Sequence, residues 1–185
     1  MLDCLAAEID AVAMRLILLR HAKTEKAAPG AQDRDRALTK RGRKDATAIG
    51  AYMAHHALIP DRALVSTAQR TRETWERLAF SPSPAVSFED DLYNAGPNDI
   101  LNIIKGGGRT ARVLLAIGHN PGFHATARLL IAAGEVAARE RLNEGLPTAG
   151  LVVIDFAVDD WGKLAPDKGR LERFVTARSL REAAD

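Results

Sequence analysis

Short, wholly apolar runs alternate with helical segments, and this pattern constrains the fold of the chain most. The runs at 16–19, 63–65 and 113–117 are too short for helices, and each contains only apolar residues. Such runs are typical of strands that are buried on both faces of a sheet. The segments at 39–56 and 69–79 place apolar residues at helical spacing. The alternation therefore predicts a three-layer α/β/α sandwich around a mostly parallel, doubly wound sheet.

The remaining segments continue this pattern. Residues 85–88 are compatible with a third strand, and Gly96-Pro97 opens a helix that we expect to run through Ile104. A further helix is expected from Asn120-Pro121 to about Ala133, with Asn120 as its cap. The last two expected strands, 151–156 and 171–176, are joined by a loop containing proline and glycine, which predicts a hairpin.

The chain length and its first residues define the expected domain organisation. A chain of 185 residues can bury a sufficient core as one domain, and we assign 14–185 to it. Residues 1–13 contain three acidic residues and no Lys or Arg, which makes them a poor secretory signal. We interpret them as an extension outside the domain. No apolar run reaches the roughly 18–20 residues that span a bilayer, so a cytoplasmic protein is expected.

Composition excludes several kinds of site. Cys4 is the only cysteine, which excludes an internal disulfide and a multi-cysteine zinc site. The formal net charge of +2 argues neither for nor against a nucleic-acid partner. Aromatic residues make up only 5% of the chain, too few for an extended base-stacking platform. No nucleic-acid partner is therefore expected.

Unusual polar residues follow three of the expected strands. Arg20 and His21 end the first strand, Ser66 ends the second with Arg70 one turn later, and His119 follows the fourth. Sites in open α/β sheets form beyond the carboxyl ends of the strands. If these strands are neighbours, two histidines and two arginines converge there.

This set of side chains suits a phosphoryl group. Guanidinium groups bind phosphate oxygens with two parallel hydrogen bonds, and a helix beginning near Asn120 adds free N–H groups. A histidine can act as a covalent nucleophile, and nearby arginines disfavour its charged form, so His21 should be neutral. Its other ring nitrogen would need a carbonyl partner to fix the tautomer. Because the arginines supply charge stabilisation, neither a metal nor a cofactor is expected.

Four motifs in order give the chain a family resemblance. They are LILLRHAKT (16–24), DRDRALTKRG (33–42), VSTAQRTRET (65–74) and IGHNPG (117–122). With them the sequence resembles the histidine phosphatase superfamily, also called phosphoglycerate mutase-like, and within it the small phosphohistidine phosphatases of the SixA type. The resemblance covers about residues 15–177 and implies a phosphoglycerate mutase-like fold.

The resemblance also implies roles for individual residues. His21 matches the histidine that becomes phosphorylated, and Arg20 and Arg70 match the arginines that clamp phosphate. His119 matches the second histidine, which contacts the phosphoryl group. Arg36 is similar to a further anion-binding arginine of the SixA type, the alternative being a solvated loop charge.

Four more residues are substrate-binding candidates. Asp33 could orient Arg36 or carry a proton. Lys23 and Thr24 lie beside the nucleophile, where they could contact phosphate or position the loop. Asn120 follows His119 directly and completes the candidate set.

Two departures from the family pattern bear on the substrate. Ala22 replaces the glycine of the usual Arg-His-Gly triplet, as SixA-like members often tolerate. Tyr93 stands where mutases and broad phosphatases carry a glutamate as general acid, although one of the acidic residues at 89–91 could substitute. An alkoxide leaving group needs such an acid, whereas a phosphorylated imidazole with a ring proton departs as neutral imidazole.

The sequence therefore predicts a metal-independent phosphatase that acts through a phosphohistidine intermediate and releases inorganic phosphate. The expected substrate is a phosphohistidine on a signalling or phosphotransfer protein, because the chain is too short for a large cap over its site. The alternatives are a phosphatase of small phosphomonoesters and a regulatory module that binds phosphate without turnover, with a mutase a weaker possibility.

Overall fold

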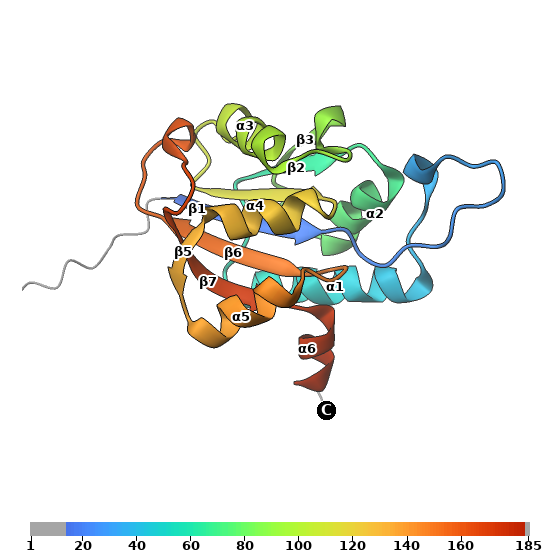
Figure 1. Ribbon diagram of the computed structural model, residues 1–185. Coiled ribbons are helices and arrows are strands. Elements are labelled where there is room, and N and C mark those ends of the chain that lie inside the picture. The colour runs from blue at the N-terminus through green and yellow to red at the C-terminus, as the bar shows by residue number, and fades with distance from the viewer. Residues whose placement is uncertain (1–13, 184–185) are drawn as a thin grey trace, which may run out of the picture.

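The computed structural model describes residues 14–183 (Figure 1). Within this range seven strands form one sheet: β1 (Met14–Arg20), β2 (Arg62–Ser66), β3 (Ala85–Glu89), β4 (Val113–Gly118), β5 (Ile131–Gly134), β6 (Leu151–Phe156) and β7 (Gly169–Val175). The α-helices described there are α1 (Lys40–His55), α2 (Gln69–Leu78), α3 (Pro97–Gly107), α4 (Gly122–Leu130), α5 (Val136–Glu144) and α6 (Ala177–Glu182). Short 3-10 helices lie at η1 (Asp33–Asp35), η2 (Asp90–Leu92) and η3 (Trp161–Lys163).

The sheet is mixed, with the strand order β3-β2-β4-β1-β6-β7-β5. Strands β3, β2, β4 and β1 run parallel to one another, as the sequence predicts. Strand β6 is antiparallel to both of its neighbours, β1 and β7, and edge strand β5 is parallel to β7. The parallel half brings the carboxyl ends of β1, β2 and β4 to the same edge of the sheet.

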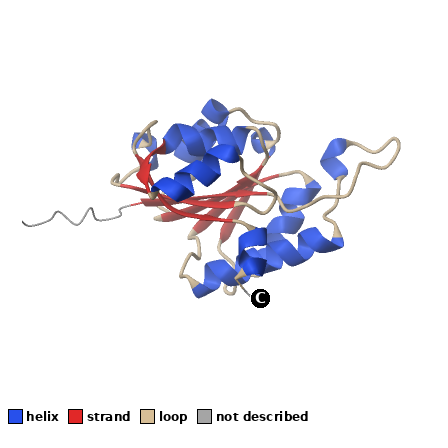
Figure 2. Cartoon of the chain, turned by 60° about the horizontal axis from the view of Figure 1, so that its bottom comes forward, coloured by secondary structure: helices blue, strands red, loops and turns tan. Residues whose placement is uncertain are grey.

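Helices cover both faces of the sheet, so the predicted three-layer sandwich is confirmed (Figure 2). Helices α3, α4 and α5 pack over one apolar core, and α1, α2 and α6 pack over the other. The central strands are buried on both faces; Leu16, Ile17, Leu18 and Leu19 all have no exposed area. Their apolar side chains alternate between the two cores, which explains why the run lacks polar residues.

Helix α1 begins where the sequence predicts and fixes the loop after β1. The Thr39 side chain caps it by accepting a hydrogen bond from the Gly42 backbone N–H at 2.9 Å. A Cβ on Gly42 would lie 2.0 Å from the Lys23 carbonyl oxygen, so only glycine allows this close approach. The same carbonyl accepts a hydrogen bond from the Thr39 backbone at 2.9 Å. Helix α1 therefore holds the chain just beyond His21.

Two expectations about α4 are wrong. The helix ends at Leu130, and 131–134 forms β5 instead of a last helical turn. The alanines there favour a helix locally, but pairing of this segment with β7 decides the structure. Asn120 does not cap α4 either, since Pro121 occupies the cap position and the Asn120 side chain bonds to the Leu146 carbonyl.

Helix α6 was not expected, although the sequence carries a signal for it. Thr176 and Ser179 form a reciprocal capping box at its start. The predicted extension at 1–13 lies outside the described residues. Over 14–183, no helix is both long and apolar enough to cross a bilayer.

Candidate active site

The candidate site forms at the carboxyl ends of β1, β2 and β4. In the sheet Arg20 is paired with Gly118, and Val65 with Ile117, so the residues that follow these strands are neighbours. The expected convergence of His21 and His119 is observed, since their ring centroids are 5.2 Å apart. Both histidines are buried, with 8% and 5% of their surface exposed.

A backbone contact fixes the tautomer of His21. Its Nδ1 lies 2.8 Å from the carbonyl oxygen of Ala22. A carbonyl only accepts hydrogen bonds, so Nδ1 carries the proton and Nε2 keeps a lone pair. Nε2 makes no hydrogen bond to the described residues. This is the carbonyl partner that the sequence analysis required, and it leaves Nε2 available as a nucleophile.

His119 uses both of its ring nitrogens within the site. Its Nδ1 lies 3.3 Å from Arg70 Nε, and its Nε2 lies 2.9 Å from Ser66 Oγ. Because the guanidinium only donates, Nδ1 is the acceptor, and the proton of the neutral ring is on Nε2, which donates to Ser66. His119 is therefore oriented by the end of β2 and by the first turn of α2.

The environment keeps both histidines neutral. Burial lowers the pKa of His21 to about 4, and the charges of Arg70, Arg20 and Arg36 add to this effect. Burial also lowers the pKa of His119 to about 3, with His21 and Arg70 contributing. The sequence predicts a neutral His21 on account of the arginines, whereas the structure gives burial as the larger cause.

Arg70 contacts Asp33 and is almost fully buried. Its Nη1 donates to the Asp33 carbonyl at 2.7 Å, and its Nη2 donates to the Asp33 carboxylate at 3.0 Å. Only 4% of the Arg70 surface is exposed. The guanidinium is thus held in place from the η1 loop as well as from its contact with His119.

Asp33 joins the loop residues to the strand ends. Its carboxylate accepts hydrogen bonds from Arg36 at 2.9 Å and from the Tyr93 hydroxyl at 2.8 Å, besides Arg70. These contacts, with Arg36 and Tyr93 first, lower the pKa of Asp33 to about 2. Arg36 also donates to Thr24 Oγ1 at 2.7 Å. The structure thus brings Thr24, Asp33 and Arg36 together beside the histidines.

Tyr93 lies against the ring of His119. The two ring centroids are 5.4 Å apart and the rings meet edge to face. The guanidinium of Arg70 also lies 5.6 Å from the Tyr93 centroid. The residue at the position of the family's acid is therefore part of the site. The acidic residues at 89–91 include Asp90, which is bound to Thr67 and Arg34 instead.

Arg20 and Asn120 share one acceptor at the other side of the site. Arg20 Nη1 and Asn120 Nδ2 donate to the Leu146 carbonyl, at 2.9 Å and 2.8 Å. Arg20 Nε and Asn120 Oδ1 are buried and have no partner in the described structure. Buried polar atoms of this kind are normally satisfied, so they mark a place for a polar ligand or water. The Lys23 side chain is exposed nearby, and both residues line a groove with it.

Three supporting contacts were not found from the sequence. The Thr74 hydroxyl accepts a hydrogen bond from the Ala22 backbone at 3.1 Å, Ser66 bonds to His119, and the Leu146 carbonyl holds Arg20. Thr74 and Ser66 lie inside one motif, which gives a weak signal for both. A backbone carbonyl leaves no signal in side-chain identity.

Together these groups place Arg20, Arg36 and Arg70 near a neutral imidazole whose Nε2 is unprotonated. Arginine side chains surround an unprotonated imidazole nitrogen, a geometry suited to accepting a phosphoryl group. Within 14–183, no group of three or more His, Cys, Asp or Glu residues is placed to bind a metal ion.

Comparisons with known proteins show the family and the fold of the chain. Residues 16–96 match a family model described as the histidine phosphatase superfamily (branch 1). An uncharacterized protein of Mycobacterium tuberculosis is 33% identical over 163 residues, which are 86% of this chain and all of that protein.

Solved structures are similar over most of the chain. A structure from Agrobacterium tumefaciens, assigned as the phosphohistidine phosphatase SixA, is 33% identical with a TM-score of 0.75, covering 88% of this chain and 97% of that chain. A structure of the protein histidine phosphatase SixA complexed with tungstate has a TM-score of 0.69 at 16% identity, covering 90% and 99% of the two chains. At that identity the likeness shows the fold alone.

Proposed function

The chain belongs to the histidine phosphatase superfamily, and on this premise we propose that it removes phosphate from phosphohistidine on another protein. Its activity as a phosphatase follows from the family. The proposal adds the substrate, the residues that act and independence from metal ions. The partner would be a signalling or phosphotransfer protein in the cytoplasm, the compartment expected from the sequence.

The first step transfers the phosphoryl group to His21. The Nε2 lone pair attacks phosphorus, the bond from phosphorus to the substrate's ring nitrogen breaks, and that nitrogen keeps the electron pair. With its other ring nitrogen protonated, the substrate leaves as neutral imidazole. The proton on His21 stays on Nδ1, which donates it to the Ala22 carbonyl oxygen 2.8 Å away. Arg20 and Arg70 stabilise the charge on the transferring oxygens, and His119 contacts them when its Nε2–H turns from Ser66 Oγ to a phosphoryl oxygen.

The second step restores the enzyme. A water oxygen bonds to phosphorus, the bond from phosphorus to Nε2 breaks, and its electron pair returns to Nε2. The protons of the water leave with inorganic phosphate. No redox change occurs, and the arginines supply the positive charge that a metal ion provides in other phosphatases.

The ionisation state of the Asp33 carboxyl group is the main support for phosphohistidine as the substrate. Arg36, Tyr93 and Arg70 all bind this carboxylate and lower its pKa to about 2, so it is ionised at neutral pH. An ionised carboxylate cannot protonate an alkoxide leaving group. A phosphorylated imidazole needs no such acid. The ionised state of Asp33 therefore supports phosphohistidine over a phosphomonoester as the proposed substrate.

The loop residues have separate roles in this proposal. Arg36 binds a phosphoryl oxygen, and Asp33 and Thr24 orient its guanidinium from two sides. Asn120 positions the Leu146 carbonyl and thereby Arg20. Lys23 contributes positive charge from the exposed rim.

Phosphate release from a histidine-phosphorylated phosphotransfer domain tests the proposal. We expect rapid release by the wild-type protein and a loss of at least about 1,000-fold in His21→Ala, since the nucleophile is gone. His55→Ala is the matched control, because it removes an exposed histidine at the end of α1. An acid-labile phosphoenzyme should form on the wild-type protein and on the control only.

Each alternative predicts a different result. Hydrolysis of small phosphomonoesters that needs His21, without release from the phosphotransfer domain, would indicate a small-molecule phosphatase. Tight phosphate binding without a phosphoenzyme would indicate a regulatory module. Loss of activity with chelator alone, and its return with added metal, would contradict metal independence.

A further inference from the structure

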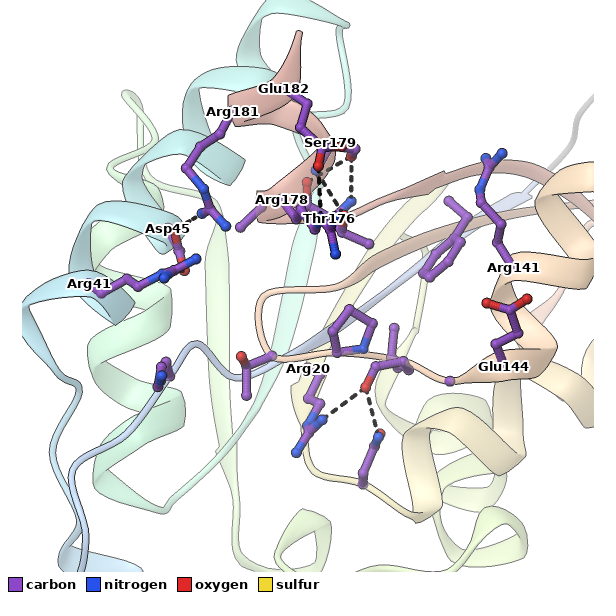
Figure 3. Close-up of a pocket in the computed structure, with 18 residues that line it drawn as sticks. Arg20, Arg41, Asp45, Arg141, Glu144, Thr176, Arg178, Ser179, Arg181 and Glu182 are labelled. Atoms are coloured by element: carbon purple, nitrogen blue, oxygen red, sulfur yellow. Dashed lines mark hydrogen bonds and ion pairs between the residues drawn. The ribbon is translucent and has the colours of Figure 1, made fainter. Parts of the chain in front are cut away.

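A wide groove extends from the candidate site toward helix α6 (Figure 3). Its volume is about 920 Å³. One wall is α6 and the start of α1, and the other is the end of α5 with the turn at 145–148. A single phosphoryl group needs only a small part of this space.

The charged residues that line the groove are predominantly basic. Six of its residues are Arg or Lys and three are acidic. Asp45 is paired with Arg181 at 2.6 Å and lies 3.8 Å from Arg41. The buried carboxylate therefore offsets part of the positive charge of these two arginines. In Figure 3 these three side chains lie together between α1 and α6.

Three further cations of the lining, Lys23, Arg141 and Arg178, are exposed. Arg178 is paired with Glu182 at 2.8 Å, but both side chains are mostly exposed, at 82% and 62%. Exposed pairs of this kind are worth little and exchange partners readily. Arg141 and Lys23 make no ion pair with the described residues. An arginine side chain is therefore available on each wall, with Glu144 on the same wall as Arg141 but in no ion pair with it.

The floor of the groove is continuous with the candidate site. Arg20 and Asn120 line its inner end and both donate to the Leu146 carbonyl. The Ala149 backbone N–H, just beyond this turn, lies 3.1 Å from the carbonyl oxygens of Arg20 and His21. When the phosphoryl group of a substrate reaches His21, the part of the substrate next to that group therefore lies at the inner end of the groove.

We propose that this groove binds an acidic segment of the protein that carries the phosphohistidine, with Arg141 and Arg178 as specificity-determining residues. The inference rests on the proposed function and names the chemistry of the partner. Small-molecule sites enclose most of their ligand, whereas this groove is open to solvent and carries charged side chains on both walls. Complementary charge on a partner protein would orient the approaching segment and speed association.

Steady-state kinetics with two peptides test this proposal. One peptide carries phosphohistidine between glutamates and the other carries it between glutamines, and p-nitrophenyl phosphate serves as a substrate without flanking residues. In the double variant Arg141→Glu, Arg178→Glu, we expect KM for the glutamate peptide to rise at least about 10-fold at low salt, with kcat unchanged. KM for the other two substrates should stay within about twofold.

A charge-matched control lies elsewhere on the surface. Lys44 and Arg77 line a separate hollow of about 370 Å³ between α1 and α2. The double variant Lys44→Glu, Arg77→Glu changes the net charge by the same amount and should leave all three KM values unchanged. Added salt should abolish the advantage of the glutamate peptide in the wild-type protein.

Several results would overturn the proposal. They are an equal rise of KM for both peptides, the same rise in the control variant, and no rise at all. An equal rise for a small phosphoester with a second carboxylate would assign the groove to small molecules. Hydrolysis of p-nitrophenyl phosphate with no hydrolysis of either peptide would instead refute the proposed function itself.

Discussion

The strand ends and the loop at 22–39 both contribute to the candidate site, but they hold their side chains differently. His21, Arg70 and His119 are 8%, 4% and 5% exposed, so they lie buried at the strand ends. The side chains of Asp33 and Arg36 are 51% and 29% exposed, although they bond to each other and Asp33 also binds Arg70. Buried groups lose little freedom when a phosphoryl group arrives, which suits the chemical step. The loop residues are more exposed, which suits the first contact with a ligand.

Substitution of Arg70 should give the largest effect that separates the two regions. Arg70→Gln removes a guanidinium at the strand ends and leaves His119 without its donor. We expect kcat to fall about 100- to 1,000-fold, as for loss of one transition-state donor. Steady-state kinetics on a phosphohistidine substrate measures this.

Two further variants control the Arg70 result. Arg77→Gln lies on the same helix, is exposed, and should retain wild-type kcat. Arg70→Lys keeps the charge without the two parallel donors and should also lose most activity while remaining folded. A change in KM alone would place Arg70 with the loop residues.

Acid should destabilise the protein through the buried histidines. The pKa of His21 is lowered from its ordinary value of 6.5 to about 4 in the folded protein. Between these values the unfolded chain binds more protons, so stability decreases as the pH falls. Each such histidine contributes about 1.4 kcal/mol per pH unit in that window.

Urea unfolding between pH 6.5 and 4.5 measures this effect. The wild-type free energy of unfolding should fall more steeply than that of His21→Ala, by about 1.4 kcal/mol per pH unit. If the free energy of unfolding changes with pH by the same amount in both proteins, burial of His21 does not lower stability in acid.

Loss of Arg36 should change binding rather than chemistry. Arg36 is half-buried on the loop, where it bonds to Asp33 and to Thr24. In Arg36→Gln we expect KM to rise about 10-fold, the loss of one charged hydrogen bond, with kcat within about threefold. Lys40→Gln, an exposed position at the start of α1, is the control. A fall in kcat comparable to that of Arg70→Gln would remove the distinction between the regions.

The smallest effect is expected for Tyr93→Phe. The substitution keeps the ring against His119 and removes only the hydroxyl that donates to Asp33 at 2.8 Å. Activity should fall by no more than about threefold. The pKa of Asp33 should rise above about 2, because the Tyr93 hydrogen bond is one of the causes of its low value. A carboxyl NMR titration measures that pKa, and an unchanged value would mean that the hydroxyl does not bind the carboxylate in solution.

Local sequence patterns were enough for most of the fold and for the centre of the site. Apolar runs and strand-end residues predicted the parallel half of the sheet and the meeting of His21 with His119. The prediction failed at 131–134, where helix-favouring alanines form edge strand β5. Pairing across the sheet is a long-range interaction that a local propensity does not contain.

The sequence by itself determined which residues follow the buried strands, because it contains the identity and spacing of the side chains. The tertiary structure alone decided how those residues are held. Tyr93 meets Asp33 across 60 residues, Ser66 meets His119 across 53, and the Leu146 carbonyl serves both Arg20 and Asn120. The conformations of loops and turns set these contacts, and loop conformation depends on packing against the finished sheet. His21 is likewise neutral because it is buried, and it is buried only when the helices pack over the strands.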